Sequence, residues 1–180
     1  NGAMAILSGD LSDGVDWRIF KVIGGELVLV DLILEKTNQD CVNELLCTDG
    51  GGAILAMRDY RTTKSLMLKI HLVRSIIRKC EAKKGGAVHL QDNAVLILED
   101  SALESNKASG TGTDAGTSGG GVSATTGSKI KVNGISSIKN NKATHSDVYV
   151  ETNGGGISLE GKDTTLEIMG DGTHLLIDGN

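Results

Sequence analysis

Short apolar runs alternate along most of the chain with corners rich in Gly, Asn, Asp or Ser. A Gly-Gly pair precedes the first apolar run of each copy and stands at residues 51, 85, 119 and 154, so the steps are 34, 34 and 35 residues. Self-similarity at a fixed period of roughly 20–50 residues is the signature of architectures in which each unit packs against the next. We therefore interpret the chain as a stack of similar units.

Each copy contains three strand-like runs, which in the third copy are expected at residues 121–124, 129–133 and 136–140. Helical repeats would need two longer runs with helical periodicity and no Gly, and these are missing. Coiling three strands per unit stacks equivalent strands about 4.8 Å apart in parallel sheets. The pattern therefore predicts an all-β fold, a parallel β-helix.

Stacking of equivalent strands predicts columns of aliphatic side chains in the core. One column is expected in the first sheet and contains Ile54, Val88, Val122 and Ile157. A second column is expected in a later strand and contains Ile77, Leu103 and Ile138. The almost continuously apolar run 27–34 is typical of a parallel strand covered on both faces.

The corners supply the candidate structural residues. Gly suits a corner that turns sharply beneath another unit, because a Cβ would clash there or a positive φ is required. Asn tolerates the left-handed conformation, and its amide can hydrogen-bond along a stack. Cys80 falls where other copies have Asn, and we expect its side chain to point inward. The final copy has no clear counterpart of the four-residue segments, 103–106 and 138–141, that end in this Asn. The structural candidates are Gly51, Gly85, Gly119, Gly154, Asn106 and Asn141.

Residues 64–82 are compatible with two structures. Apolar positions lie at helical spacing, Thr62 or Thr63 would cap a helix, and Lys83 and Lys84 before Gly85 would end it. However, residues 77–82 align without gaps with residues 103–108 of the next copy. We expect a strand, with an extra residue or bulge.

Polar excursions leave successive copies at the same place. Segments 38–50, 109–118 and 142–153 are rich in small or polar residues, and 109–118 in particular predicts a flexible loop. Excursions from one corner of successive units line up along one edge, where repeat architectures place their variation. Cys41 and Cys47 flank the first excursion and would pair only in an oxidising compartment.

The net charge of −5 is unevenly distributed. Residues 58–84 hold nine Lys or Arg against Asp59 and Glu81, a local charge of +7, which leaves −12 for the rest. A solvated face explains such a stretch, and a patch for an acidic partner is the alternative. The best candidate for a lyase-type site is the basic stripe of Lys69, His71, Arg74 and Arg78 near His89, but it has no paired acids. The candidate binding patch comprises Lys69, His71, Arg74, Arg78, Lys83 and Lys84.

The Gly-Gly-Ala-aliphatic and Asn tetrads resemble the repeats of the polymorphic membrane proteins of chlamydiae, which are autotransporter adhesins. Residues 51–54 and 85–88 match the first motif, and residues 119–122 and 154–157 match it with Gly in place of Ala. Residues 103–106 and 138–141 keep the Asn of the second motif and have an aliphatic residue where the family has Phe. The resemblance covers roughly residues 15–180. It implies a right-handed β-helix that is exposed on a cell surface and mediates adhesion, with no catalytic residues.

The sequence carries little sign of site chemistry. We expect no catalytic residues, no metal site and no cofactor, because the carboxylates Asp92, Glu99 and Asp100 lie on one copy only and the four His share no ligand spacing. Surface positions are expected for the histidines. Nucleic-acid binding needs a basic chain with stacking aromatics, and this acidic chain has only four aromatic residues. No apolar run approaches the ~18 residues of a membrane span.

We thus expect residues 1–180 to form a single right-handed parallel β-helix (solenoid) of about five to six turns with long loops at one corner, as an excerpt of a longer repeat protein. The expected function is that of a non-enzymatic, extracellular or surface-displayed scaffold or adhesin that presents loops to a protein or glycan on a cell surface. One alternative is a carbohydrate-active β-helix enzyme, like a polysaccharide lyase or hydrolase. Another is an architectural subunit that docks on neighbouring subunits of an assembly.

Overall fold

A computed structural model describes residues 4–8, 18–36, 50–58, 67–110, 116–145 and 152–180. Every regular element in these ranges is a β-strand, and every strand pairing is parallel. The prediction of an all-β fold with stacked parallel strands is confirmed. The arrangement is compatible with a β-helix or solenoid.

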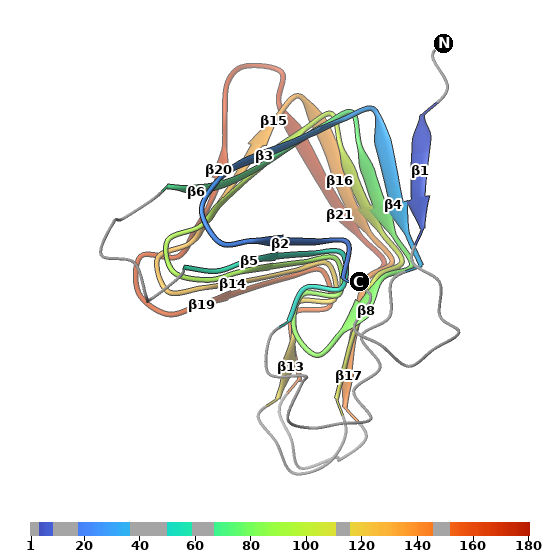
Figure 1. The fold of residues 1–180 in the computed structure, drawn as a ribbon, viewed down its shortest axis with the longest axis vertical. Coiled ribbons are helices and arrows are strands. Elements are labelled where there is room, and N and C mark those ends of the chain that lie inside the picture. The colour runs from blue at the N-terminus through green and yellow to red at the C-terminus, as the bar shows by residue number, and fades with distance from the viewer. Residues whose placement is uncertain (1–3, 9–17, 37–49, 59–66, 111–115, 146–151) are drawn as a thin grey trace.

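Three large sheets enclose the core, and two small sheets extend from one corner (Figure 1). Sheet A contains, in spatial order, β1 (Ala5–Ser8), β4 (Leu32–Glu35), β7 (Ile76–Arg78), β11 (Ala102–Glu104), β16 (Ile135–Lys139) and β21 (His174–Asp178). Sheet B contains β2 (Phe20–Val22), β5 (Ile54–Ala56), β9 (Val88–Leu90), β14 (Val122–Thr125) and β19 (Ile157–Glu160). Sheet C contains β3 (Gly25–Val30), β6 (Leu68–Val73), β10 (Val95–Glu99), β15 (Lys129–Asn133) and β20 (Thr165–Ile168).

The small sheets are D and E. Sheet D contains β8 (Glu81–Ala82), β12 (Lys107–Gly110) and β17 (Lys142–His145), and sheet E contains β13 (Thr117–Ser118) and β18 (Thr152–Asn153). Along the chain, strands of sheets B, C and A follow one another in that order, and the next strand of sheet B then begins a new set. We call each set of three strands, such as β9–β10–β11, a rung. Successive rungs stack in register (Figure 1).

Both predicted columns of aliphatic side chains are confirmed by the strand register. In sheet B, Val88 pairs with Ile54 on one side and with Val122 on the other, and Val122 pairs with Ile157. In sheet A, Leu103 lies between Ile77 and Ile138. The second column also extends further than predicted, to Leu34 at one end and Ile177 at the other.

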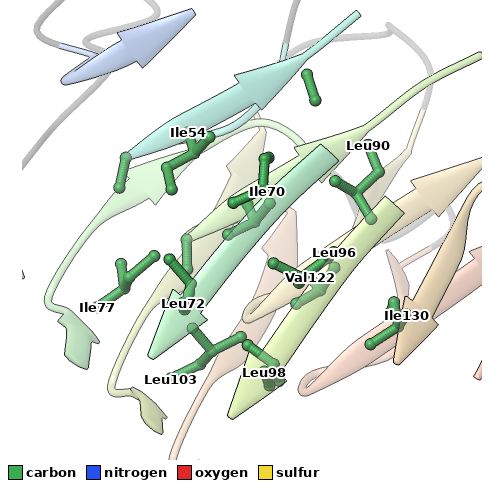
Figure 2. Close-up of a cluster of buried hydrophobic side chains, with 14 of the residues drawn as sticks. Ile54, Ile70, Leu72, Ile77, Leu90, Leu96, Leu98, Leu103, Val122 and Ile130 are labelled. Atoms are coloured by element: carbon green, nitrogen blue, oxygen red, sulfur yellow. The ribbon is translucent and has the colours of Figure 1, made fainter. Parts of the chain in front are cut away.

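The core between the three sheets is almost purely aliphatic. Buried members from sheet C include Leu72 and Leu98, which are register partners on neighbouring strands, and Figure 2 shows them among the other buried side chains. Burial of a Leu or Ile side chain contributes roughly 1.5–3 kcal/mol. Because each rung covers the apolar side chains of the next, stability is close to additive along the stack.

Residues 67–82 are strands, as we expected from their alignment with the next copy. They form β6, β7 and β8, in which Leu68, Ile70 and Leu72 point into the core while the intervening side chains are partly exposed. Residues 64–66 lie outside the described residues. The helical spacing of the apolar positions was thus coincidental, and stacking on neighbouring rungs determines the conformation.

The interpretation of residues 27–34 as a strand covered on both faces is wrong. This run divides into β3 and β4, and Asp31 turns the corner between them with φ 54°. Leu29 and Leu34 are buried, but Val28 and Val30 on the outer face of sheet C are 49% and 44% exposed. Sheet C therefore has one face in the core and one face in solvent at this rung.

The Gly-Gly pairs superpose at the corner where β5, β9, β14 and β19 of sheet B begin. The first Gly of each pair has a positive φ, and its amide donates across the stack, as Gly85 does to Ser118 O and Gly119 to Asn153 O. A Cβ on Gly86 or Gly120 would overlap a backbone carbonyl oxygen of the following rung. Only Gly therefore allows the rungs to approach this closely.

A ladder of buried Asn side chains holds the corner after sheet A. Asn106 Nδ2 donates to Ile77 O (3.0 Å) and to Asn141 Oδ1 (2.9 Å), and Asn141 Nδ2 donates to Leu103 O (3.0 Å) and to Asn180 Oδ1 (3.1 Å). Asn180 Nδ2 donates to Ile138 O in the same way, so the final copy does have its Asn. Cys80 occupies the corresponding place in the preceding rung and is buried, as expected.

A second polar ladder was not predicted. Ser75, Ser101 and Ser136 are buried at the start of successive strands of sheet A, and each hydroxyl accepts the backbone N–H of the preceding rung. The Ser101 hydroxyl donates to the carbonyl oxygens of Leu72 and Glu99. The ladder satisfies backbone groups that the core would otherwise leave without partners.

Candidate functional site

Two of the predicted excursions form a projection that extends from one corner of the stack (Figure 1). We call this projection, residues 107–110, 116–118, 142–145 and 152–153, the arm. In it β12 pairs with β17 and β13 pairs with β18, so the strands that lead into and out of each excursion continue the parallel stacking. The arm therefore has a fixed base, set by backbone hydrogen bonds.

Small side chains fill the space between the two layers of the arm. Ala108, Gly110 and Thr117 are buried, and Thr117 Oγ1 donates to Thr144 O (3.2 Å). A Cβ on Gly110 would lie 2.7 Å from carbon atoms of Thr117 and His145. The layers are thus too close for larger residues, which makes the base of the arm thin and tightly packed.

Both ends of segment 109–118, which we expect to be a flexible loop, are strands in the structure. Residues 109–110 and 117–118 belong to strands of the arm, and residues 142–145 and 152–153 of the next excursion do as well. Residues 111–115 and 146–151 lie outside the described residues, as does 37–49 with Cys41 and Cys47. Composition did not reveal these strands because their small polar residues face the opposite layer of the arm.

The candidate binding patch does not form one surface. Lys69, His71 and Arg74 belong to sheet C and its corner, whereas Arg78 is on sheet A and Lys83 and Lys84 follow sheet D. Lys84 forms a parallel bridge to Ser118 at the base of the arm. Residues close in sequence are therefore distributed over separate faces.

Basic residues of this stripe form ion pairs with acids that come from neighbouring rungs. Lys69 Nζ lies 2.7 Å from Glu26 Oε1, and His71 Nε2 lies 3.0 Å from Glu99 Oε2. Across the next corner, Arg74 donates to both oxygens of Asp31 (2.7 and 2.8 Å).

Two arginines lower the pKa values of the acids that they contact, Asp31 and Glu35. The hydrogen bonds from Arg74, with a smaller electrostatic contribution from its charge, lower the pKa of Asp31 against the opposing effect of desolvation. The hydrogen bond from Arg78 Nε (2.7 Å) lowers the pKa of Glu35 in the same way. The basic residues of sheet C and its corner are therefore matched by acids one rung away.

A different set of basic side chains has fewer acidic partners and lies where sheet A passes into sheet D, at the foot of the arm. We call it the lysine edge, and it contains Lys36, Lys79, Lys107, Lys139 and Lys142. Lys107 Nζ lies 2.7 Å from Glu81 Oε1, and Lys36 Nζ lies 3.9 Å from Glu35 Oε1. Within the described part of the chain, Lys79, Lys139 and Lys142 form no ion pair. This edge is not visible in the sequence, because its members come from rungs whose equivalent positions are 26–43 residues apart.

The expectation that the histidines lie on the surface is wrong for His89, which is 1% exposed. Its Nδ1 lies 3.2 Å from Ser123 O and its Nε2 lies 2.8 Å from Gln91 Nε2. The side chain points to the outer side of sheet B, where Leu55 and Ser123 are also buried. His89 therefore lies away from Lys69, His71 and Arg74, which are on sheet C and its corner.

The carboxylates and histidines of the described residues do not gather into a metal-binding cluster. In those ranges no three His, Cys, Asp or Glu side chains come together as metal ligands. Glu99 has Val73 and Asn133 as its register neighbours, and Asp100 occupies the following corner at the place that Arg74 has in the preceding rung. None of the described segments is a helix of the length and apolar character needed to cross a bilayer.

Comparison of the chain with models of protein families, with curated proteins and with solved structures finds no match. The resemblance to polymorphic membrane protein repeats therefore stays a prediction based on the Gly and Asn tetrads.

Proposed function

We propose that the chain is a right-handed parallel β-helix of about five to six turns that serves as a non-enzymatic scaffold for binding. In this proposal it is displayed on a cell surface or secreted, as the resemblance to chlamydial-type adhesin repeats implies, and its partner is a protein or glycan of another surface.

One observation supports the proposal most strongly: the excursions leave the stack at one corner and begin as paired strands of the arm. A rigid base costs little conformational entropy on binding, because the backbone at the start of each loop is already ordered. Binding residues of many proteins lie on loops held by such a scaffold. The arm is accordingly the proposed binding region.

The chain itself offers the control for an experiment. At the equivalent corner of an earlier copy, only the two residues Lys83 and Lys84 connect Ala82 to Gly85, without an excursion. Replacing residues 109–118 by Lys-Lys copies this short corner, and the stack of sheets A, B and C should retain its far-UV circular dichroism.

Binding of the intact chain and of this short-corner variant is then compared on a panel of cells and a glycan array. We expect the intact chain to bind at least one surface and the variant to lose most of that binding. Equal binding by the two proteins would refute the role of the arm. Cleavage of a uronic-acid polymer by the intact chain would instead favour the enzyme alternative.

A further inference from the structure

We propose that the lysine edge binds a linear acidic polysaccharide that lies along the stacking direction. The proposal rests on the function proposed above and deepens it, because it gives the chemistry of the partner. It also replaces the predicted patch, whose residues lie on separate faces, by a set of lysines at the foot of the arm.

The lysines of the edge are distributed over successive rungs. Lys36, Lys79 and Lys107 come from three successive rungs, and the fourth rung contributes Lys139 and Lys142. Rungs of a parallel stack are about 4.8 Å apart, so the edge extends over about 15 Å. A polymer with regularly repeated negative charges, laid along this edge, meets at least one lysine at every rung.

The edge also has a local excess of positive charge. Although the chain has a net charge of −5, Lys79, Lys139 and Lys142 form no ion pair with another described residue. Glu104 and Asp178 lie in register on either side of Lys139 without forming an ion pair with it. On sheet C, by contrast, Lys69 and Lys131 contact acids at 2.7 Å and 3.3 Å. Fewer of the lysines on the lysine edge than on sheet C are therefore already paired with an acid.

The residue types of the lysine edge bear on the class of polyanion. Lys is a hydrated point charge on a flexible stem, so it can contact charges repeated along a flexible polymer without requiring a fixed bidentate geometry. A peptide partner would need apolar anchors in its binding site, and the positions next to the lysines are occupied by residues such as Ser105 and Asn140. Single-stranded nucleic acid would need stacking aromatics, and the whole chain has four aromatic residues. An acidic polysaccharide has neither requirement.

The test measures binding of the intact chain to immobilised hyaluronan, which carries carboxylates, and to dextran sulfate, which carries sulfates. Uncharged dextran and poly-glutamate are the reference polymers. The edge variant is K79Q/K139Q/K142Q, and the matched control is K69Q/K129Q/K131Q on sheet C, which changes the net charge by the same amount. Far-UV circular dichroism verifies that both variants are folded.

We expect the edge variant to bind at least one of the two acidic polysaccharides about tenfold to thirtyfold more weakly, because each exposed ion pair is worth roughly a factor of two to three. Its affinity should also depend less steeply on salt concentration. The control variant should lose less than about threefold, because its lysines are engaged with acids.

Absence of binding to both acidic polysaccharides would overturn the proposal, as would equal losses in the two variants or tighter binding to poly-glutamate. If the edge variant still binds cells while the short-corner variant does not, the polysaccharide proposal fails and the proposed scaffold function stands. If the intact chain binds an acidic polysaccharide but binds no cell or glycan surface through the arm, the scaffold function fails instead.

Discussion

Replacing Asn141 by Ala should destabilise the fold more than its single small side chain suggests. Asn141 is 1% exposed, and its amide connects three rungs. Its Oδ1 accepts from the backbone N–H (3.0 Å) and from Nδ2 (2.9 Å) of Asn106. Its Nδ2 donates to Leu103 O (3.0 Å) and to Asn180 Oδ1 (3.1 Å).

The size of the effect follows from the groups that the substitution leaves behind. The backbone N–H of Asn106 loses its acceptor in a buried place, which costs roughly 1–3 kcal/mol. Leu103 O loses a donor as well, and each ordinary hydrogen bond contributes about 1 kcal/mol. Asn106 Nδ2 keeps its hydrogen bond to Ile77 O, and the side-chain oxygen Oδ1 of Asn180 still accepts from the backbone N–H of residue 141. These groups therefore add little to the loss of stability. We expect a loss of about 2–4 kcal/mol in the free energy of unfolding.

Urea denaturation followed by far-UV circular dichroism measures this loss. The adjacent Asn140 provides the control, because it has φ 54° and the next rung has Gly179 at the same place. Asn140→Gly should change the unfolding free energy by less than about 1 kcal/mol. If Asn141→Ala costs no more than this control, then the ladder contributes little and our reasoning about the corner is wrong.

Three further changes test other parts of the stack. Gly86→Ala should lower the free energy of unfolding, measured by urea denaturation, by more than about 3 kcal/mol or prevent folding, because the added Cβ would overlap the backbone of the next rung. The control is Gly172→Ala, which should cost only about 1 kcal/mol because no atom outside its chain neighbours lies within 4 Å of the added Cβ. The contact with Arg74 lowers the pKa of Asp31 in the folded state, so the ionised Asp31 contributes its full stabilisation above about pH 4 and loses it as the pH falls through the folded-state pKa. Arg74→Gln removes this contact and should therefore reduce the difference in melting temperature between neutral and acidic pH. Leu103→Ala removes a fully buried side chain and should cost about 2–5 kcal/mol, measured in the same denaturation experiment.

The stacking itself could be predicted because the Gly-Gly pairs keep an almost constant spacing. The strands expected at 129–133 and 136–140 agree with β15 (Lys129–Asn133) and β16 (Ile135–Lys139) to within a residue, since Gly127, Gly134 and Asn140 mark the corners that flank them. The aliphatic columns followed from the same alignment.

The ladders were only partly predictable because the segments between their members vary in length. Cys80, Asn106, Asn141 and Asn180 are separated by 26, 35 and 39 residues, so a search at a fixed period misses the last member. The signal that would have found it is the offset from the preceding aliphatic residue, which is three positions for Leu103 and for Ile177 alike.

The charged surfaces could not be predicted, since the partner of a surface side chain comes from a neighbouring rung. Arg74 follows Asp31 by 43 residues, and no local pattern connects the two. The lysine edge was hidden for the same reason. Register must be known before a basic stretch of sequence can be translated into a basic surface.

The central claim is that equivalent residues of successive rungs stack directly on one another, and nuclear Overhauser effects between methyl groups test it most directly. We predict contacts from the Leu103 methyls to Ile77 on one side and to Ile138 on the other. Leu103 methyl contacts confined to residues a few positions away in sequence, with none to Ile77 or Ile138, would contradict the account.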